Sequence, residues 1–257
     1  DTWLKVWRRV VLTVHRRFVE GATRYRLASG GAMIAIVGGD GAGKSTVVDG
    51  LRKWLGKHFA MTTVHMGKPD WSWTTVTIRA VLKIGNLLRL YPVDSSFRET
   101  LGQRSPVSPG YPWLLRELCK ARDRYFTYRR ARRFAAGGGL VILDRFPLSR
   151  IKLMDGPQVE RFVRELEARP EGKQFLSPHR DSALVRFLER REHSFYEQTV
   201  TPDVLIALRV DPEVAVRRKT DEAAASVFER SSEIWALDWN GSGAHLIDAA
   251  KPRAEVL

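Results

Sequence analysis

The stretch "GGDGAGKST", residues 38–46, lies between an apolar run and an amphipathic run, and it decides the fold that this sequence predicts. The preceding residues 32–37, "AMIAIV", are typical of a short buried strand, and residues 44–59, "KSTVVDGLRKWLGKHF", have a helical pattern. The pattern G-x-x-x-x-G-K-[ST] is satisfied by Gly38, Gly43, Lys44 and Ser45. A strand, this loop and a helix in succession predict a phosphate-binding P-loop (Walker A motif).

The residue types of the loop indicate how it would hold a nucleoside triphosphate. Glycines let successive backbone N–H groups point at phosphate oxygens, and the following helix adds its positive dipole end. Lys44 is expected to bridge the β- and γ-phosphates, and Ser45 to hold Mg²⁺ through its hydroxyl. The predicted nucleotide-binding residues are Gly38, Asp40, Gly41, Ala42, Gly43, Lys44, Ser45 and Thr46. The sequence has neither an N-K-x-D guanine motif nor an L-S-G-G-Q motif, which favours a kinase that uses ATP and Mg²⁺.

Strand patterns alternate with helical patterns along the chain. The expected strands are residues 32–39, 61–66, 140–144, 203–210 and 244–248. The helical patterns between and after them include a long basic one that ends near residue 136, and others at 158–169, 181–198 and 212–239. This alternation predicts a three-layer α/β P-loop kinase fold, in which a parallel five-stranded sheet is covered by helices on both faces. No linker is apparent after residue 31, so residues 32–257 are expected to form one domain.

Residues 1–31 form a basic extension ahead of this domain. Its apolar positions fall on one narrow helical face: Trp3, Trp7, Val10, Val11, Val14 and Phe18. We expect this amphipathic helix to pack on the domain, and peripheral contact with a membrane surface is the alternative.

Composition limits the location and partners of the protein. Its 43 Lys and Arg against 29 Asp and Glu give a formal charge of +14, which favours anionic partners. Cys119 is the only cysteine, so no disulfide forms within the chain, as is usual in a reducing compartment. No apolar run approaches the roughly 18 residues of a membrane span, and the start lacks a signal-peptide pattern. We therefore expect a cytoplasmic protein.

A second motif, "LVILDRF" at residues 140–146, ends a strand with an acidic and a basic residue. The strand carries Asp144 to the carboxyl edge of the sheet, where ligands bind in open α/β folds. There Asp144 is expected to coordinate Mg²⁺ or to accept a proton from an attacking hydroxyl. Arg145 beside it suits a bidentate grip on an anionic acceptor.

In their order along the chain, the motifs resemble those of the thymidylate kinase family of nucleoside monophosphate kinases. The P-loop is similar to that family's G-x-D-G-x-G-K-S/T, "ARDR" at 121–124 to its A-A-D-R, and "DRF" at 144–146 to its D-R-Y. "PDVLIALRVDPEVAVRRK" at 202–219 and "HLIDA" at 245–249 also resemble family segments, and the resemblance covers residues 32 to about 250.

The resemblance implies roles for individual residues. Asp40 would contact the acceptor, Arg124 would help to hold its head, and Arg145 would bind its phosphate. A mobile lid within 217–230 would close over the transferred phosphoryl group, where a cation stabilises the transition state. The candidate lid arginines are Arg217, Arg218 and Arg230. Family members are commonly dimers, so a homodimer is implied as well.

The acceptor half departs from the family pattern. "HMGKP" at 65–69 replaces the family's R-E-P-G-G, and "PLSRIKLMDGP" at 147–157 replaces its serine and A-Y-Q segment. The aromatic-rich residues 67–112 would then form an acceptor-side insertion or ordinary core. Further candidates for acceptor binding are His65, Lys68 and Asp155. The acceptor therefore stays open between dTMP or a related nucleoside monophosphate and a sugar or surface-glycan hydroxyl.

A function of another class, a nucleic-acid-binding regulatory NTPase, rests on the basic residues of segments 1–31 and 116–133. Arg122, Arg129 and Arg133 lie on one side of the long helix, where they would track a phosphate backbone. The same helix carries "ARDR", which the kinase hypothesis needs near the acceptor, so the kinase hypothesis is favoured.

Overall fold

The computed structural model describes residues 25–88, 111–148, 150–151, 156–161, 163 and 183–251. Most of the predicted N-terminal helix lies outside these residues. Its described part, 25–31, is extended and turned instead of helical. Tyr25 forms an isolated parallel bridge with Phe59, and Gly30 adopts a φ of 95°, so neither position continues a helix.

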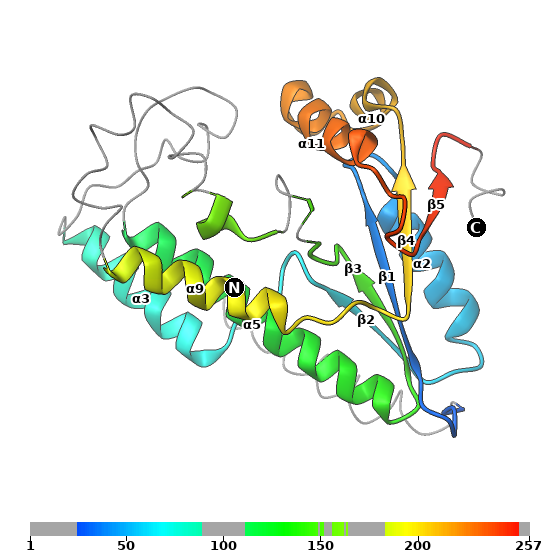
Figure 1. Cartoon of the computed structure of the whole chain (residues 1–257), viewed down its shortest axis with the longest axis horizontal. Coiled ribbons are helices and arrows are strands. Elements are labelled where there is room, and N and C mark those ends of the chain that lie inside the picture. The colour runs from blue at the N-terminus through cyan, green and yellow to red at the C-terminus, as the bar shows by residue number, and fades with distance from the viewer. Residues whose placement is uncertain are drawn as a thin grey trace, which may run out of the picture.

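Five parallel strands form one sheet in the order β2-β3-β1-β4-β5 (Figure 1). In chain order the strands are β1 (Ala32–Gly38), β2 (Met61–His65), β3 (Leu140–Asp144), β4 (Val204–Arg209) and β5 (Ala244–Asp248). The predicted fold class and all five strands are confirmed.

Helices cover both faces of this sheet (Figure 1). They are α2 (Lys44–Leu55), α3 (Trp73–Leu87), α5 (Tyr111–Ala136), α9 (Ala183–Glu197), α10 (Pro212–Arg218) and α11 (Ala224–Ala236). Alternate residues of β1 face opposite layers: Ala35 and Val37 pack in a core cluster with residues of α5, whereas Ile36 packs with residues of α2 and α10. Helices α3 and α9 pack on the outer side of α5, which therefore lies between them and the sheet.

The strand register brings the functional motifs to one edge. Asp144 is level with Ile36 on one side and with His65 on the other. The carboxyl ends of β1, β2 and β3 therefore meet, and the P-loop follows β1 at that edge.

One helical prediction was wrong. The pattern at 212–239 indicated a single helix, whereas α10 ends at Arg218 and α11 begins at Ala224. Asp211 caps α10 by accepting from the backbone N–H groups of Glu213 (2.8 Å) and Val214 (3.4 Å). The intervening "KTDEA", residues 219–223, contains Thr220 and Asp221, which have low helix propensity. Lys219 at its start lies 3.7 Å from Asp40 of the P-loop and pairs with Glu222.

A buried carboxylate on α9 fixes the start of a helix that the structure describes from residue 158. Glu192 accepts from the backbone N–H groups of Gln158 (3.0 Å), Val159 (2.8 Å) and Glu160 (3.0 Å). Burial raises the pKa of Glu192 to about 7, although these three hydrogen bonds act in the opposite direction.

Of the helices that the structure describes, none has the length and apolar content that crossing a bilayer requires.

Candidate active site

The P-loop makes its turn through left-handed glycines in close contact with α10 and α11. Gly41 has a φ of 74°, and a Cβ there would lie 2.8 Å from the carbonyl oxygen of Ala215 on α10. At Gly39 a Cβ would lie 2.9 Å from Oγ of Ser231 on α11. These two positions therefore require glycine, which lets the loop and the α10–α11 unit touch.

Lys44 begins α2, and its side chain folds back over the loop. Its Nζ donates to the carbonyl oxygens of Gly38 (2.9 Å) and Gly39 (2.6 Å). The ammonium group is thus buried at the amino end of a helix, where the helix dipole also favours an anion.

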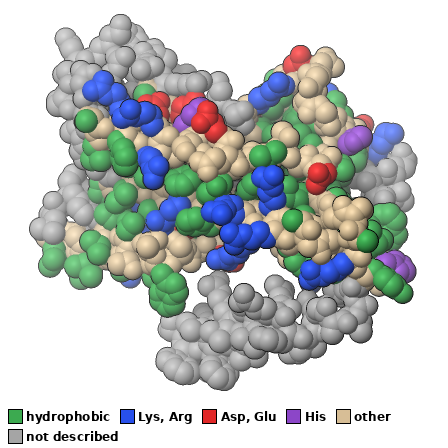
Figure 2. Space-filling view, turned by 60° about the horizontal axis from the view of Figure 1, so that its bottom comes forward, with side chains coloured by type: hydrophobic (Ala, Val, Ile, Leu, Met, Phe, Trp, Pro, Cys, Tyr) green, Lys and Arg blue, Asp and Glu red, His purple; other side chains and the backbone are tan. Residues whose placement is uncertain are grey.

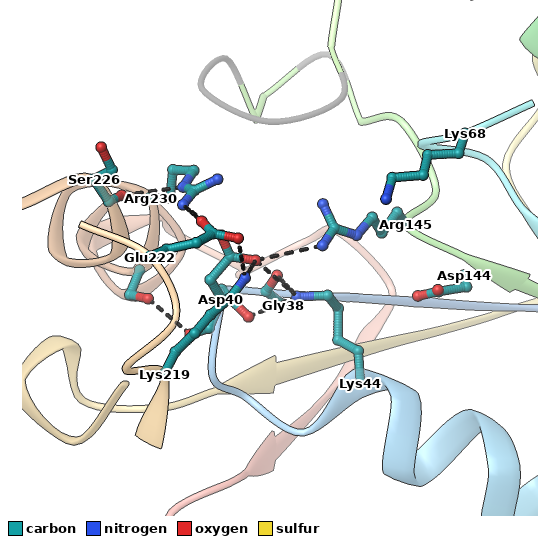
Figure 3. A network of polar contacts seen from close by, with 12 residues as sticks. Gly38, Asp40, Lys44, Lys68, Asp144, Arg145, Lys219, Glu222, Ser226 and Arg230 are labelled. Carbon is teal, nitrogen blue, oxygen red and sulfur yellow. Dashed lines mark hydrogen bonds and ion pairs between the residues drawn. The ribbon is translucent and has the colours of Figure 1, made fainter. Parts of the chain in front are cut away.

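Four cations converge on the carboxylate of Asp40, which is 2% exposed (Figure 3). Its Oδ1 lies 3.9 Å from Lys44 Nζ, 3.5 Å from Arg145 Nη2 and 3.7 Å from Lys219 Nζ. Its Oδ2 lies 3.0 Å from Arg230 Nη2, without the geometry of a hydrogen bond. Charge is therefore the main interaction that holds this cluster together.

Lys219 and Arg230 also share a second carboxylate. Lys219 Nζ lies 2.6 Å from Glu222 Oε1, and Arg230 pairs with the other oxygen. Hydrogen bonds from Lys219 and Arg230 lower the pKa of Glu222 to about 2. Ser231 Oγ adds a hydrogen bond to the backbone oxygen of Asp40 (3.0 Å). The segment between α10 and α11 is thereby fastened to the P-loop.

The predicted lid arginines have three different environments. Arg230 faces the loop, as described above. Arg218 donates to the backbone oxygen of Ala249 after β5 (2.7 Å), and Arg217 is exposed. Lys219 was not among the predicted site residues. No local pattern marks it, because its position depends on how α10 packs on the P-loop, where Ala215, one helical turn before Lys219, contacts Gly41.

Asp144 ends β3 with one carboxylate oxygen near His65 and the other without a hydrogen-bond partner. Its Oδ2 lies 3.7 Å from His65 Nε2, while His65 Nδ1 accepts from the backbone N–H of Lys68 (3.2 Å). The other oxygen, Oδ1, is buried without a hydrogen-bond partner in the structure as described. A buried acceptor of this kind is suited to a ligand.

Arg145 follows with a φ of 57°, the only positive φ of a non-glycine residue in the described part of the chain. Its backbone N–H donates to the oxygen of Ile36 (3.1 Å), and its side chain reaches Asp40. Left-handed backbone at a bulky residue stores strain, which is common where a side chain is aimed at a ligand. Figure 3 shows the exposed Lys68 side chain extending toward Arg145.

Arg124, on α5, is buried and connects the end of β2 with α9. Its Nε donates to the backbone oxygen of Met66 (3.1 Å), and its Nη1 donates to the hydroxyl of Tyr196 on α9 (2.7 Å). That hydroxyl in turn donates to the backbone oxygen of Gly156 (3.1 Å). Tyr196 was missed from the sequence because it comes 72 residues after Arg124 and belongs to no motif.

A pocket lies between the P-loop and the residues that follow β3. Its lining residues are Val37, Gly38, Lys44, Arg145, Phe146, Pro147, Leu148, Ile151 and Gly156. Charge is confined to the P-loop end, and the rest of the wall is largely apolar. The predicted acceptor residue Asp155 lies outside the described residues, as does most of the segment 67–112 beyond residue 88.

The donor set fits a magnesium ion that arrives with a nucleotide. Ser45 is exposed at the start of α2, and Asp144 provides the unpartnered oxygen. Within the described ranges no group of three or more His, Cys, Asp or Glu residues is arranged to hold a metal. Mg²⁺ bound mainly by phosphates and water needs only one or two protein ligands.

Comparison with known proteins places these features in context. No protein-family model matches the chain. It is 29% identical over 230 residues to the uncharacterized ATP-binding protein YghR of Escherichia coli strain K12, covering 88% of this chain and 83% of that protein. It is 26% identical over 234 residues to the uncharacterized ATP-binding protein YghS of the same strain, covering 88% and 89%. Among solved structures, deoxyadenosine kinase from M. mycoides with bound dATP gives a TM-score of 0.43 at 14% identity, covering 88% of this chain and 94% of that chain.

Proposed function

We propose that this protein is an ATP-dependent phosphotransferase that moves the γ-phosphoryl group of ATP to a small acceptor. The observation that carries the proposal is the convergence of Lys44, Arg145, Lys219 and Arg230 at the mouth of the P-loop. Phosphoryl transfer needs cations on several sides of the group in flight, because negative charge spreads over its oxygens in the transition state. The names of both relatives, which call them ATP-binding proteins, support ATP as the donor.

In this proposal the four cations divide between the two halves of the reaction. Lys44 and the loop N–H groups bind the β- and γ-phosphates, and Arg230 and Lys219 approach from the lid. Arg145, which lines the pocket, holds the acceptor in line with the γ-phosphoryl group. Asp40 keeps the four cations close to one another. The cations therefore need little rearrangement when a polyphosphate binds beside them.

Ser45 and Asp144 are the residues that would hold Mg²⁺, which neutralises charge on the phosphate oxygens when bound. His65 keeps the Asp144 carboxylate in place through Oδ2, and the open Oδ1 is left for the ligand.

For the acceptor we propose dTMP or a related nucleoside monophosphate, because Arg145 offers a guanidinium group to a phosphate inside a pocket with an apolar wall. A sugar or glycan hydroxyl is the second candidate. The observation in its favour is that Arg124 already donates to Met66 and Tyr196, which leaves fewer of its N–H groups for the phosphate of an acceptor.

The test is ADP release from Mg-ATP with a panel of dTMP, other nucleoside monophosphates, free sugars and glycan extracts. Lys44→Ala is expected to lower turnover by about 100-fold or more, the order seen when a key transition-state donor is removed. Lys53→Ala, an exposed lysine on the same helix, is the matched control and should behave as the parent. ATP binding without acceptor-stimulated ADP release across the whole panel would refute the proposal.

A further inference from the structure

Helix α3 presents an apolar stripe to the outside of the molecule. The exposed side chains of the stripe are Trp73 (87%), Val76 (42%), Val81 (62%), Ile84 (56%), Leu87 (81%) and, just after the helix, Leu88 (62%). At about 100° per residue these positions share one side of the helix. The opposite side, with Thr75 and Gly85 buried, packs toward α5.

This concentration of apolar surface is unusual for the molecule. Seven of the 17 exposed large hydrophobic side chains in the described residues fall within 71–88, the seventh being Trp71. Isolated exposed apolar residues are ordinary, whereas a contiguous group of this kind marks an interaction surface.

The charges within residues 71–88 have one sign, although the exposed Asp70 directly precedes this stretch. Residues 71–88 contain no Asp or Glu, and their charged residues are Arg79 and Lys83. The Arg79 guanidinium lies 3.9 Å from the centre of the Trp71 ring. Both charges are therefore basic and lie within the same stretch as the apolar side chains.

The neighbouring helix extends this positive charge. Arg122 of α5 contacts Ser72 Oγ (2.8 Å) and Thr75 Oγ1 (2.9 Å) at the start of α3. Two and three turns later, the same side of α5 carries the exposed Arg129 and Arg133. The only acid within 118–136, Asp123, is buried and lies 3.7 Å from Arg122, so the free positive charge of this side rests on Arg129 and Arg133. In Figure 2 hydrophobic side chains gather on the side where Figure 1 places α3, and Lys and Arg side chains lie beside them.

We propose that this face, the α3 stripe together with the basic side of α5, docks on an anionic lipid surface. A helix with Trp and aliphatic residues on one side and Lys and Arg beside them lies in the plane of a membrane interface, where the cations meet acidic headgroups. A second copy is disfavoured as the occupant, because a symmetric pair would bring two basic stretches into one interface. Nucleic acid supplies phosphate but no matching apolar layer.

The experiment is flotation of the full chain with vesicles of phosphatidylcholine, with and without phosphatidylglycerol. We expect binding to the anionic vesicles that weakens with salt, and little binding to phosphatidylcholine alone. Ile84→Gln combined with Leu87→Gln should lower the bound fraction about tenfold, since interfacial affinity scales with buried apolar area. Trp73→Gln is a second, independent variant. Both sets change exposed side chains, so unfolding temperatures should stay at the parental value.

One matched control and one charge variant separate this face from the rest of the chain. Trp54→Gln on α2 removes an exposed aromatic residue elsewhere and should leave binding unchanged. Arg129→Gln with Arg133→Gln should reduce binding to anionic vesicles and flatten its salt dependence.

Three results would overturn the proposal. The first is no binding of the parent to anionic vesicles. The second is undiminished binding of the Ile84→Gln, Leu87→Gln variant, which would assign attachment to another part of the chain such as residues 1–31. The third is a dimer in sedimentation velocity that these substitutions dissociate, which would make the stripe a contact between copies of this chain.

Discussion

The substitution Asp40→Asn tests whether one carboxylate assembles the cation cluster. It removes the charge while keeping the shape of a side chain that is 2% exposed. Four cations within 3.0–3.9 Å of its oxygens would then repel one another without compensation. Removing one partner of a buried ion pair costs about 3–5 kcal/mol. Because Arg145, Lys219 and Arg230 keep 20–29% side-chain exposure, solvent relieves part of the repulsion, and we expect a loss of about 2–3 kcal/mol.

The assay is urea-induced unfolding in a low-salt buffer without phosphate. Adding inorganic pyrophosphate should stabilise Asp40→Asn more than the parent, because the anion replaces the missing charge instead of competing with it. Asp49→Asn, an exposed carboxylate on α2, is the control and should change the free energy of unfolding by less than about 0.5 kcal/mol. If Asp40→Asn unfolds like this control and pyrophosphate stabilises both variants equally, Asp40 does not hold the cluster.

Three further predictions concern the carboxylate of α9, the loop glycines and the brace behind the pocket. The pKa of Glu192 is raised in the folded state, so its contribution to stability is complete below its ordinary value of 4.5 and is lost as pH rises through about 7. This contribution amounts to about 3 kcal/mol, so the free energy of unfolding should depend less on pH in Glu192→Gln than in the parent. Parallel pH profiles of the two proteins would contradict this prediction. Gly41→Ala should lower the free energy of unfolding by about 2 kcal/mol or more and should also abolish ATP binding. Gly43→Ala, where a Cβ meets nothing within 4 Å, should lose less stability. Equal losses of stability would contradict the contact argument. Tyr196→Phe removes two hydrogen bonds and should lower stability by about 1–2 kcal/mol while raising the acceptor KM and leaving the ATP KM unchanged; a change in the ATP KM alone would count against a role on the acceptor side.

The fold was predictable because its signals are local. Buried parallel strands are continuous apolar runs in the sequence, and the glycines between β1 and α2 indicate a turn that few other residues can make. The break between α10 and α11 was not visible, because "KTDEA" at 219–223 interrupts the pattern for less than two turns, and contacts with the P-loop decide its conformation.

The residues of the candidate site also differ in whether a local pattern or the packing of distant helices determines their position. The positions of Lys44, Asp144 and Arg145 followed from the rule that parallel strands end at a common edge. Lys219 and Tyr196 depend instead on how α10 and α9 pack, and no local pattern reports that packing. The difference between Arg217 and Arg230 likewise comes from helical phase relative to the loop.

The balance between cations and carboxylates at the P-loop bears on which anions the site would bind. Four cations, Lys44, Arg145, Lys219 and Arg230, face two carboxylates, Asp40 and Glu222, which leaves two net positive charges at the loop. We expect a singly charged anion to gain less by entering, because it can offset only one of these two charges. A polyphosphate carries enough charge to offset both, so we expect a protein that is basic overall to favour nucleotides in this pocket.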